Sequence, residues 1–325
     1  MTTLTSLIDS YNAATTAIPN TALGIALSPQ FIAQDAVTTA PGAYSGIYAF
    51  GDSLSDAGNV SIGTLRVVPV SPPYSAGRFT NGNVWVQDLA QTLRLPAVKP
   101  SLAGGTDYAI GGAETGKTDA HAQNPIDLPS QLAQFEAAVP KPSATALYTV
   151  WAGANDVLDI ANSALSAPLQ AGAVRQAVAN ETSFITALAS HGARHLVVLD
   201  VPDLGKTPYE AARPKTEAIA STLAQQYNAD LATSLRQVMA TGAVSIDLVD
   251  TYSLLDAAIA HPSAYGFTNV TQPVWTGNLM DAHKGTLNAT GVAQNGYLFF
   301  DDLHPTAASH TLLASAVTQS LTHPA

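Results

Sequence analysis

The sequence predicts an α/β protein, a three-layer α/β/α sandwich around a central, mainly parallel sheet of about five strands. Short apolar runs recur from residue 46 onward, and stretches with the 3.6-residue periodicity of helices separate them. Apolar runs that alternate with helices in this way are typical of parallel strands buried on both faces. The predicted strands cover residues 47–50, 108–110, 147–151, 196–199 and 244–249.

The N-terminal segment, residues 1–45, is expected to be an extension of the domain that follows. It contains apolar residues with the spacing of a short amphipathic helix, namely Leu4, Leu7, Ile8 and Tyr11. The rest of the segment is expected to be irregular. Because no linker, low-complexity tract or repeat interrupts the remaining chain, we expect one domain over residues 46–325.

Two long helices are predicted between the strands. Apolar residues recur at helical spacing over residues 171–190 and again over residues 216–240. Gly192 and Gly242 follow these stretches, and glycine is favoured just beyond a helix C-terminus because it adopts left-handed backbone angles without steric cost. Both stretches are therefore expected to end at their glycine.

The composition excludes several classes of function. The net charge is −11 over 325 residues, and no basic stripe is available to bind a phosphate backbone, so nucleic acid is not an expected partner. There is no cysteine, which excludes disulfides and thiolate zinc sites. No cluster of histidines has metal-ligand spacing, so we expect no metal and no cofactor, and a chelator should leave turnover intact. No protein partner is indicated.

The sequence also bears on the location of the protein. It contains no apolar stretch long enough for a transmembrane segment, and residues 1–45 lack the basic start and apolar core of a signal peptide. Because the chain is poor in lysine and rich in threonine and serine, we hypothesise export to the periplasm or the outside, with a leader that this sequence does not include. A cytoplasmic location is the open alternative.

A serine follows the first predicted strand in a tight, glycine-containing turn. Residues 50–59 read Phe-Gly-Asp-Ser-Leu-Ser-Asp-Ala-Gly-Asn, with Ser53 where the apolar run ends and helix-permissive residues begin. This predicts Ser53 at a helix N-terminus, where backbone N–H groups favour the negative charge that develops in acyl transfer. A plain N-cap serine is the structural alternative.

The far end of the chain supplies the partners that a nucleophilic serine needs. Residues 301–306 read Asp-Asp-Leu-His-Pro-Thr, so a carboxylate stands three residues before His304. His304 is expected to take the Ser53 proton as general base, and a carboxylate to hold the imidazole. Asp301 and Asp302 are both candidates for this orienting role.

Four separated blocks resemble the GDSL esterases and lipases of the SGNH hydrolase superfamily. They are Gly-Asp-Ser-Leu at residues 51–54, Tyr-Ala-Ile-Gly-Gly-Ala at 108–113, Gly-Ala-Asn-Asp at 153–156, and Asp301 with His304. The resemblance extends over residues 46–320 and implies an SGNH hydrolase-like, flavodoxin-like sandwich. It implies a serine esterase that hydrolyses carboxylic esters through an acyl-enzyme on Ser53.

The resemblance also implies roles for individual residues. Asp301 rather than Asp302 matches the motif position, so the implied catalytic residues are Ser53, Asp301 and His304. The implied oxyanion hole consists of the backbone N–H groups of Ser53 and Gly112 and the side-chain amide of Asn155, with Gly111 as the alternative to Gly112. Ser53, Gly112 and Asn155 each follow a different predicted strand, and open α/β sheets bind ligands at that edge.

Other functions remain open. Residues 111–118 read Gly-Gly-Ala-Glu-Thr-Gly-Lys-Thr and match the phosphate-binding pattern G-x-x-x-x-G-K-[ST], but no helical pattern follows directly. A carbohydrate- or lipid-binding module without turnover is a second alternative, and an acyltransferase with the same triad is a third. Candidate substrates are short-chain acyl, lipid and acetylated-sugar esters, and we expect short acyl chains.

Overall fold

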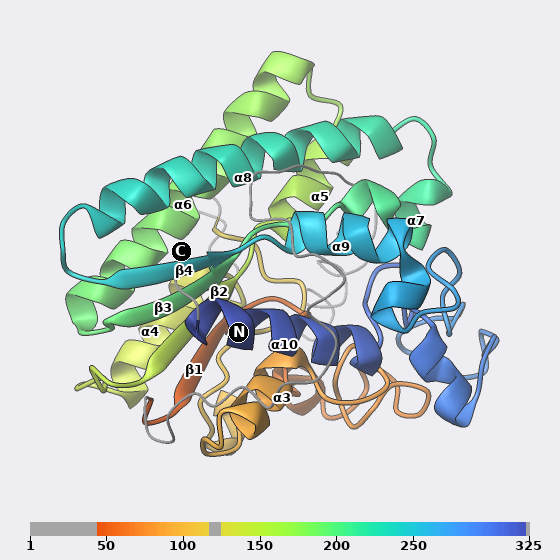
Figure 1. Cartoon of the computed structure of the whole chain (residues 1–325), viewed down its shortest axis with the longest axis horizontal. Coiled ribbons are helices and arrows are strands. Elements are labelled where there is room, and N and C mark those ends of the chain that lie inside the picture. The colour runs from red at the N-terminus through yellow and green to blue at the C-terminus, as the bar shows by residue number, and fades with distance from the viewer. Residues whose placement is uncertain (1–43, 117–124, 323–325) are drawn as a thin grey trace.

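The computed structural model describes residues 44–116 and 125–322 (Figure 1). One sheet of four parallel strands, in the order β1-β2-β3-β4, forms its centre. The strands are β1 (Ile47–Gly51), β2 (Leu147–Trp151), β3 (His195–Leu199) and β4 (Ser245–Val249). Four of the five predicted strands are therefore confirmed. The helix predicted around residues 4–11 lies outside the described residues.

Both faces of the sheet are buried, as the continuous apolar runs predict. Successive side chains of a strand point to opposite faces. Phe50 and Val150 belong to the apolar cluster on one face, and Ala49 and Val197 belong to the cluster on the other. The α/β sandwich is thus confirmed.

The strand predicted at residues 108–110 is wrong as a strand. The segment does run parallel to β1, and the Tyr108 N–H donates to Ala49 O (2.7 Å), but only an isolated bridge joins Asp107 to Ala49. The next bond of the ladder is missing, because the Gly51 N–H that would donate to this segment donates to Gln131 Oε1 (2.9 Å) instead. If this segment is counted at the outer edge of the sheet beside β1, the order of segments across the sheet is the flavodoxin-like order 2-1-3-4-5.

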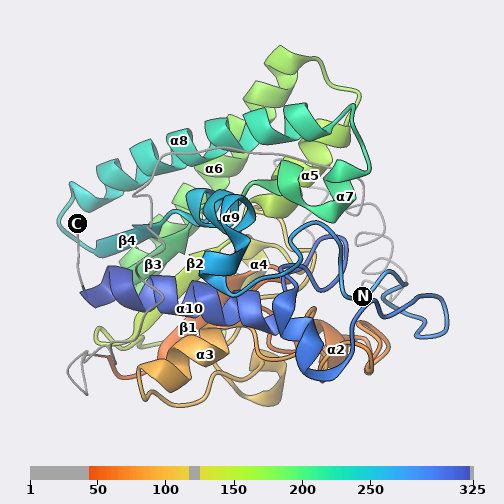
Figure 2. The same cartoon turned by 45° about the vertical axis from the view of Figure 1, so that its right-hand side comes forward.

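Helices cover the two faces of the sheet (Figures 1 and 2). One layer contains α4 (Leu128–Ala138), α5 (Ala154–Asn162), α6 (Ala167–His191) and α8 (Glu217–Met239), and the other contains α3 (Trp85–Thr92), α9 (Thr251–Ala260) and α10 (Ala307–Thr322). In both views α10 lies beside α3. Shorter elements occur in the loops: α2 (Asn59–Gly63), α7 (Pro208–Ala211), and the 3-10 segments Ser101–Ala103, Leu204–Lys206, Pro262–Tyr265 and Gly291–Gly296.

The two long predicted helices are confirmed as α6 and α8. Gly192 caps α6 with φ = 132°, and its N–H donates to Leu188 O (3.1 Å). Gly242 has φ = 71°, and its N–H donates to Met239 O (2.9 Å) just beyond α8. Both glycines adopt positive φ angles, as expected of residues that end a helix.

Candidate active site

The loop that carries Ser53 leaves the sheet at Gly51, the last residue of β1. Gly51 has φ = 136°, and a Cβ built on it would lie 1.9 Å from the Trp151 carbonyl oxygen of β2, so only glycine fits. Gln131 of α4 accepts the Gly51 N–H on Oε1 (2.9 Å) and donates from Nε2 to Gly51 O (2.8 Å). The start of the loop is therefore held on both sides.

Ser53 lies in a turn and not at the N-terminus of a helix. Its predicted position at a helix N-terminus is therefore wrong, and it is not a helix N-cap. The N–H groups of Ser55 and Asp56 close a single turn around Ser53, but α2 begins only at Asn59. Asp56 explains the interruption, because its Oδ1 accepts the N–H groups of Gly58 (2.7 Å) and Asn59 (2.5 Å). Gly58 itself has φ = 134°, which no helix contains.

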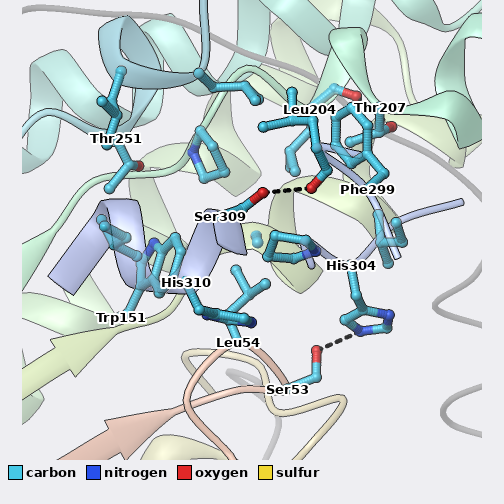
Figure 3. A pocket seen from close by; sticks show the side chains of 18 of the residues that line it. Ser53, Leu54, Trp151, Leu204, Thr207, Thr251, Phe299, His304, Ser309 and His310 are labelled. Carbon is cyan, nitrogen blue, oxygen red and sulfur yellow. Dashed lines mark hydrogen bonds between the residues drawn. The ribbon is translucent and has the colours of Figure 1, made fainter. Parts of the chain in front are cut away.

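Side chains from distant parts of the sequence meet at this turn. His304 Nε2 lies 2.9 Å from Ser53 Oγ (Figure 3). His304 Nδ1 lies 2.8 Å from Asp301 Oδ2 and 3.0 Å from Oδ1. The three residues are buried, whereas the rival Asp302 is exposed. This is the geometry of a nucleophile, a base and a group that orients the base.

The Asp301 carboxylate has further donors around it. Its Oδ1 accepts the backbone N–H groups of Leu303 (2.9 Å) and His304 (2.6 Å). Its Oδ2 accepts the hydroxyl of Tyr74 at 2.7 Å. Tyr74 was not found by the sequence analysis, because nothing in the proline-rich run around it points to a residue more than two hundred positions away. Phe79, which stacks on the His304 ring with centroids 5.2 Å apart, was also missed.

Asp301 and His304 shift each other's pKa in opposite directions. Burial alone would raise the pKa of Asp301, but the charge of His304 and hydrogen bonds from His304 and Tyr74 outweigh burial and lower it. Burial alone would lower the pKa of His304, but the charge and hydrogen bond of Asp301 outweigh burial and raise it. The pair therefore favours an ionised carboxylate beside an imidazole that is readily protonated.

Replacing Tyr74 with phenylalanine is expected to lower the free energy of unfolding by about 2 kcal/mol, because a buried carboxylate loses a hydrogen bond. Denaturant unfolding at neutral pH measures this change. Tyr297→Phe is a matched control, since Tyr297 packs against the same apolar cluster and is only partly buried. Equal stability of the Tyr74 variant and the wild type would show that the hydroxyl does not stabilise Asp301.

Possible oxyanion donors lie around the same turn. Among the residues that the structure describes, the backbone N–H groups of Ser53 and Gly112 have no acceptor, whereas the Gly111 N–H donates to Asp56 Oδ2 (2.9 Å). Gly112 is therefore the better candidate of the two glycines. Asn155, in the first turn of α5, donates from Nδ2 to Ala113 O (2.9 Å), so its amide lies close to the Gly112 segment.

Asp52 adds a second group that titrates near neutral pH. Its Oδ1 accepts the Leu54 N–H (2.9 Å), and it is 1% exposed. Burial raises the pKa of Asp52 to about 7, against the lowering effect of this hydrogen bond and of the charge of His304. Its titration must therefore be separated from that of His304 in any pH profile.

A cavity of about 100 Å³ opens beside Ser53 and His304. Asn155 also lines it, whereas Gly112 does not, and Asp301 lies behind His304. Most of the wall is apolar and comes from α9, α10 and the loop before α10 (Figure 3), as with Leu254, Leu313 and Phe299. The site therefore combines polar groups at one end with an apolar recess, as small-molecule sites commonly do.

The phosphate-loop alternative finds little support in the described part of the chain. Lys117 and Thr118 lie outside it. The Gly111 N–H, which would face a phosphate in that reading, donates to the Asp56 carboxylate instead. Within residues 44–116 and 125–322, no three His, Cys, Asp or Glu side chains are grouped to hold a metal ion, and no helix could span a membrane.

The chain is similar to known proteins over most of its length. The chain is 25% identical over 309 residues to a phosphatidylcholine-sterol acyltransferase of Aeromonas hydrophila, covering 84% of this chain and 88% of that protein. It is 28% identical over 315 residues to a GDSL esterase/lipase of Arabidopsis thaliana, covering 82% and 84%.

Among solved structures, the chain overlaps with LAE5, an α/β hydrolase from the metagenome of Lake Arreo, at a TM-score of 0.45 and 14% identity, covering 86% of this chain and 95% of that one. The model of the GDSL-like lipase/acylhydrolase family matches residues 47–317. Because this match takes in most of the sequence, the chain belongs to the GDSL-like lipase/acylhydrolase family.

Proposed function

We propose that this protein is a serine esterase that hydrolyses carboxylic esters through an acyl-enzyme on Ser53. Ser53 Oγ attacks the ester carbonyl carbon while its proton passes to His304 Nε2. The alcohol then leaves with that proton. Water, activated by the same imidazole, attacks the acyl-enzyme and releases the acid. Asp301 keeps the other ring proton on Nδ1 and stabilises the imidazolium.

The contact that carries the proposal is the 2.9 Å separation of Ser53 Oγ and His304 Nε2, which joins residues 251 positions apart. Ser53 is buried against His304, the pKa of His304 is raised, and the Asp301 carboxylate contacts the other ring nitrogen. The stability of the fold gives no evident reason for this arrangement, which is typical of a functional site. The N–H groups of Ser53 and Gly112, for which residues 44–116 and 125–322 provide no acceptor, support the assignment of an oxyanion hole together with the Asn155 amide.

The test is acyl transfer to Ser53 itself. After rapid mixing of the full chain with p-nitrophenyl acetate and an acid quench, mass spectrometry is expected to find acetate on the peptide that contains Ser53. Release of p-nitrophenol in a burst before steady state should accompany it. Rapid turnover with acetate on another residue would contradict the proposal, and absence of turnover on any ester would favour a binding module.

The activity is expected to fall at acid pH. His304 must be neutral to accept the serine proton, so kcat/KM decreases as the pH falls through its pKa, which Asp301 raises above 6.5. A profile for p-nitrophenyl acetate over pH 5–9 should therefore have its acid limb above pH 6.5. The Asp52→Asn variant separates the two groups. If His304 causes the acid limb, the variant retains it; if Asp52 causes it, the limb disappears. A flat profile from pH 5 to 8 would rule out His304 as the base.

An acyltransferase is the second candidate, favoured by the name of the Aeromonas hydrophila relative. The same acyl-enzyme can pass its acyl group to an alcohol in place of water. Product analysis in the presence of added alcohols separates the two: a new ester formed in preference to the free acid would favour acyl transfer.

A further inference from the structure

The cavity beside Ser53 has hydrogen-bonding groups in an otherwise apolar wall, and their pattern bears on the ester that the proposed esterase takes. Its volume of about 100 Å³ is smaller than the roughly 150 Å³ cavity that holds benzene, so it accommodates about four non-hydrogen atoms. A short acyl chain fits wholly within this space, whereas a p-nitrophenyl group is too large to be enclosed by it. In a p-nitrophenyl ester the acyl chain is therefore the part that can enter.

Three hydroxyl groups that line the cavity already donate hydrogen bonds to backbone carbonyl groups of the protein. Thr207 Oγ1 donates to Leu204 O (2.7 Å), Thr251 Oγ1 donates to Asp200 O (2.6 Å), and Ser309 Oγ donates to Leu298 O (2.6 Å). Figure 3 shows the last of these contacts at the wall of the cavity. These hydroxyls can still accept a hydrogen bond from a ligand, but they have no proton left to donate.

His310 of α10 differs from them. The Trp85 backbone N–H donates to His310 Nδ1 (3.3 Å), which places the proton of the neutral ring on Nε2. Burial, together with the charge of His304, lowers the pKa of His310 to about 3, so the ring is neutral at working pH. The sequence analysis assigned His310 no role.

The Nε2–H group of His310 has no acceptor among the residues that the structure describes. The side chain lines the cavity although the residue is only 1% exposed, and Nε2 is not one of the polar atoms sealed within the protein. A buried N–H without an acceptor costs free energy unless a ligand or a water satisfies it. The cavity therefore holds an uncommitted donor directed at whatever occupies it.

We propose that the cavity is the acyl site of the proposed esterase and selects a short hydroxyacyl chain, whose oxygen accepts a hydrogen bond from His310 Nε2–H. An alkyl chain of the same shape fills the same space but leaves the donor unsatisfied. The hydroxyl of such a chain can also act as a donor, because the threonine and serine hydroxyl oxygens of the cavity wall can still accept a hydrogen bond. His310 is thus a specificity-determining residue beside the triad.

The experiment compares p-nitrophenyl esters that differ only by a hydroxyl in place of a methyl group. The pairs are 3-hydroxybutyryl with 3-methylbutyryl and 2-hydroxybutyryl with 2-methylbutyryl, which are nearly equal in shape. We expect the wild-type chain to favour at least one hydroxy ester in kcat/KM by about fivefold, the size of one hydrogen bond. The ratio should fall below one in His310→Phe, and His310→Gln, which keeps an N–H donor, should restore part of it.

The ratio of kcat/KM for two esters on the same protein does not depend on the fraction of protein that is folded. This matters because His310→Phe also leaves the Trp85 N–H without its acceptor. If that variant does not fold, competitive inhibition of the wild type by free 3-hydroxybutyrate and 3-methylbutyrate gives the same comparison. A wild-type preference for the methyl esters, or equal ratios in wild type and His310→Phe, would overturn the inference. Failure of the proposed function is different, since it appears either as no hydrolysis of any ester, p-nitrophenyl acetate included, or as acetate on a residue other than Ser53.

Discussion

Replacing Ser53 with alanine is expected to lower kcat for p-nitrophenyl acetate by about 10,000-fold or more, because removal of a triad nucleophile leaves only the contributions of binding and the oxyanion hole. Steady-state release of p-nitrophenol measures the loss. The fold should survive, since Ser53 Oγ has His304 as its hydrogen-bond partner and no partner in the sheet. His304→Ala should cost a similar factor, and the double variant little more, because the two residues act as a unit.

Ser190→Ala is a suitable control for this experiment. Ser190 is an exposed serine of α6 whose hydroxyl donates to Thr186 O (2.8 Å), and it does not line the cavity. Its variant should match the wild type in kcat and in thermal unfolding. Near-normal turnover by both Ser53→Ala and His304→Ala would exclude the proposed mechanism.

Replacing Asp301 with asparagine is expected to lower kcat by about 1,000- to 10,000-fold. Asp301 accepts hydrogen bonds on both oxygens, from two backbone N–H groups on Oδ1 and from Tyr74 on Oδ2. If the asparagine oxygen keeps the backbone donors, its NH2 group faces His304 Nδ1. The ring must then carry its proton on Nε2, where it cannot accept the proton of Ser53.

Asp302→Asn is the matched control, with the same chemical change one residue away. Asp302 is exposed, and its contact to a neighbouring element is the backbone one in which its carbonyl accepts the Tyr209 N–H (2.8 Å), so the substitution preserves it. We expect less than about a fivefold change in kcat, through the weaker field at His304. Equal losses in the two variants would leave the orienting role unassigned.

The sheet and its long helices could be predicted because hydrophobic burial alone determines them. The strands of Val150 and Val197 consist mostly of buried apolar residues, and the glycines after α6 and α8 mark the helix ends. The edge segment could not be predicted as irregular, since the competing bond comes from the distant Gln131 side chain, which accepts the Gly51 N–H, and not from the apolar pattern. The turn at Ser53 failed for a similar reason, because Asp56 captures N–H groups that a helix would use.

Contacts between residues close in sequence could be predicted from their spacing, and the meeting of Ser53 with His304 was expected from the motif blocks, whereas contacts made by residues outside those blocks could not be predicted. Asp301 and His304 are three residues apart, so their contact follows from local spacing. Tyr74 and the Asp301 carboxylate meet only because two loops fold over each other. His310 likewise acquires its tautomer from the Trp85 backbone of another helix, which no pattern around residue 310 reveals.

Position 51 tolerates no side chain, because even a methyl group would strike the Trp151 carbonyl of the neighbouring strand. Any larger residue would wedge the first two strands apart and carry the nucleophile away from its base. The glycine that opens the Gly-Asp-Ser-Leu block is therefore a steric requirement, and it makes no contribution to bond making or breaking. Substitutions in this protein can change the cavity wall that contacts the ester, but Gly51, two residues before Ser53, must remain glycine.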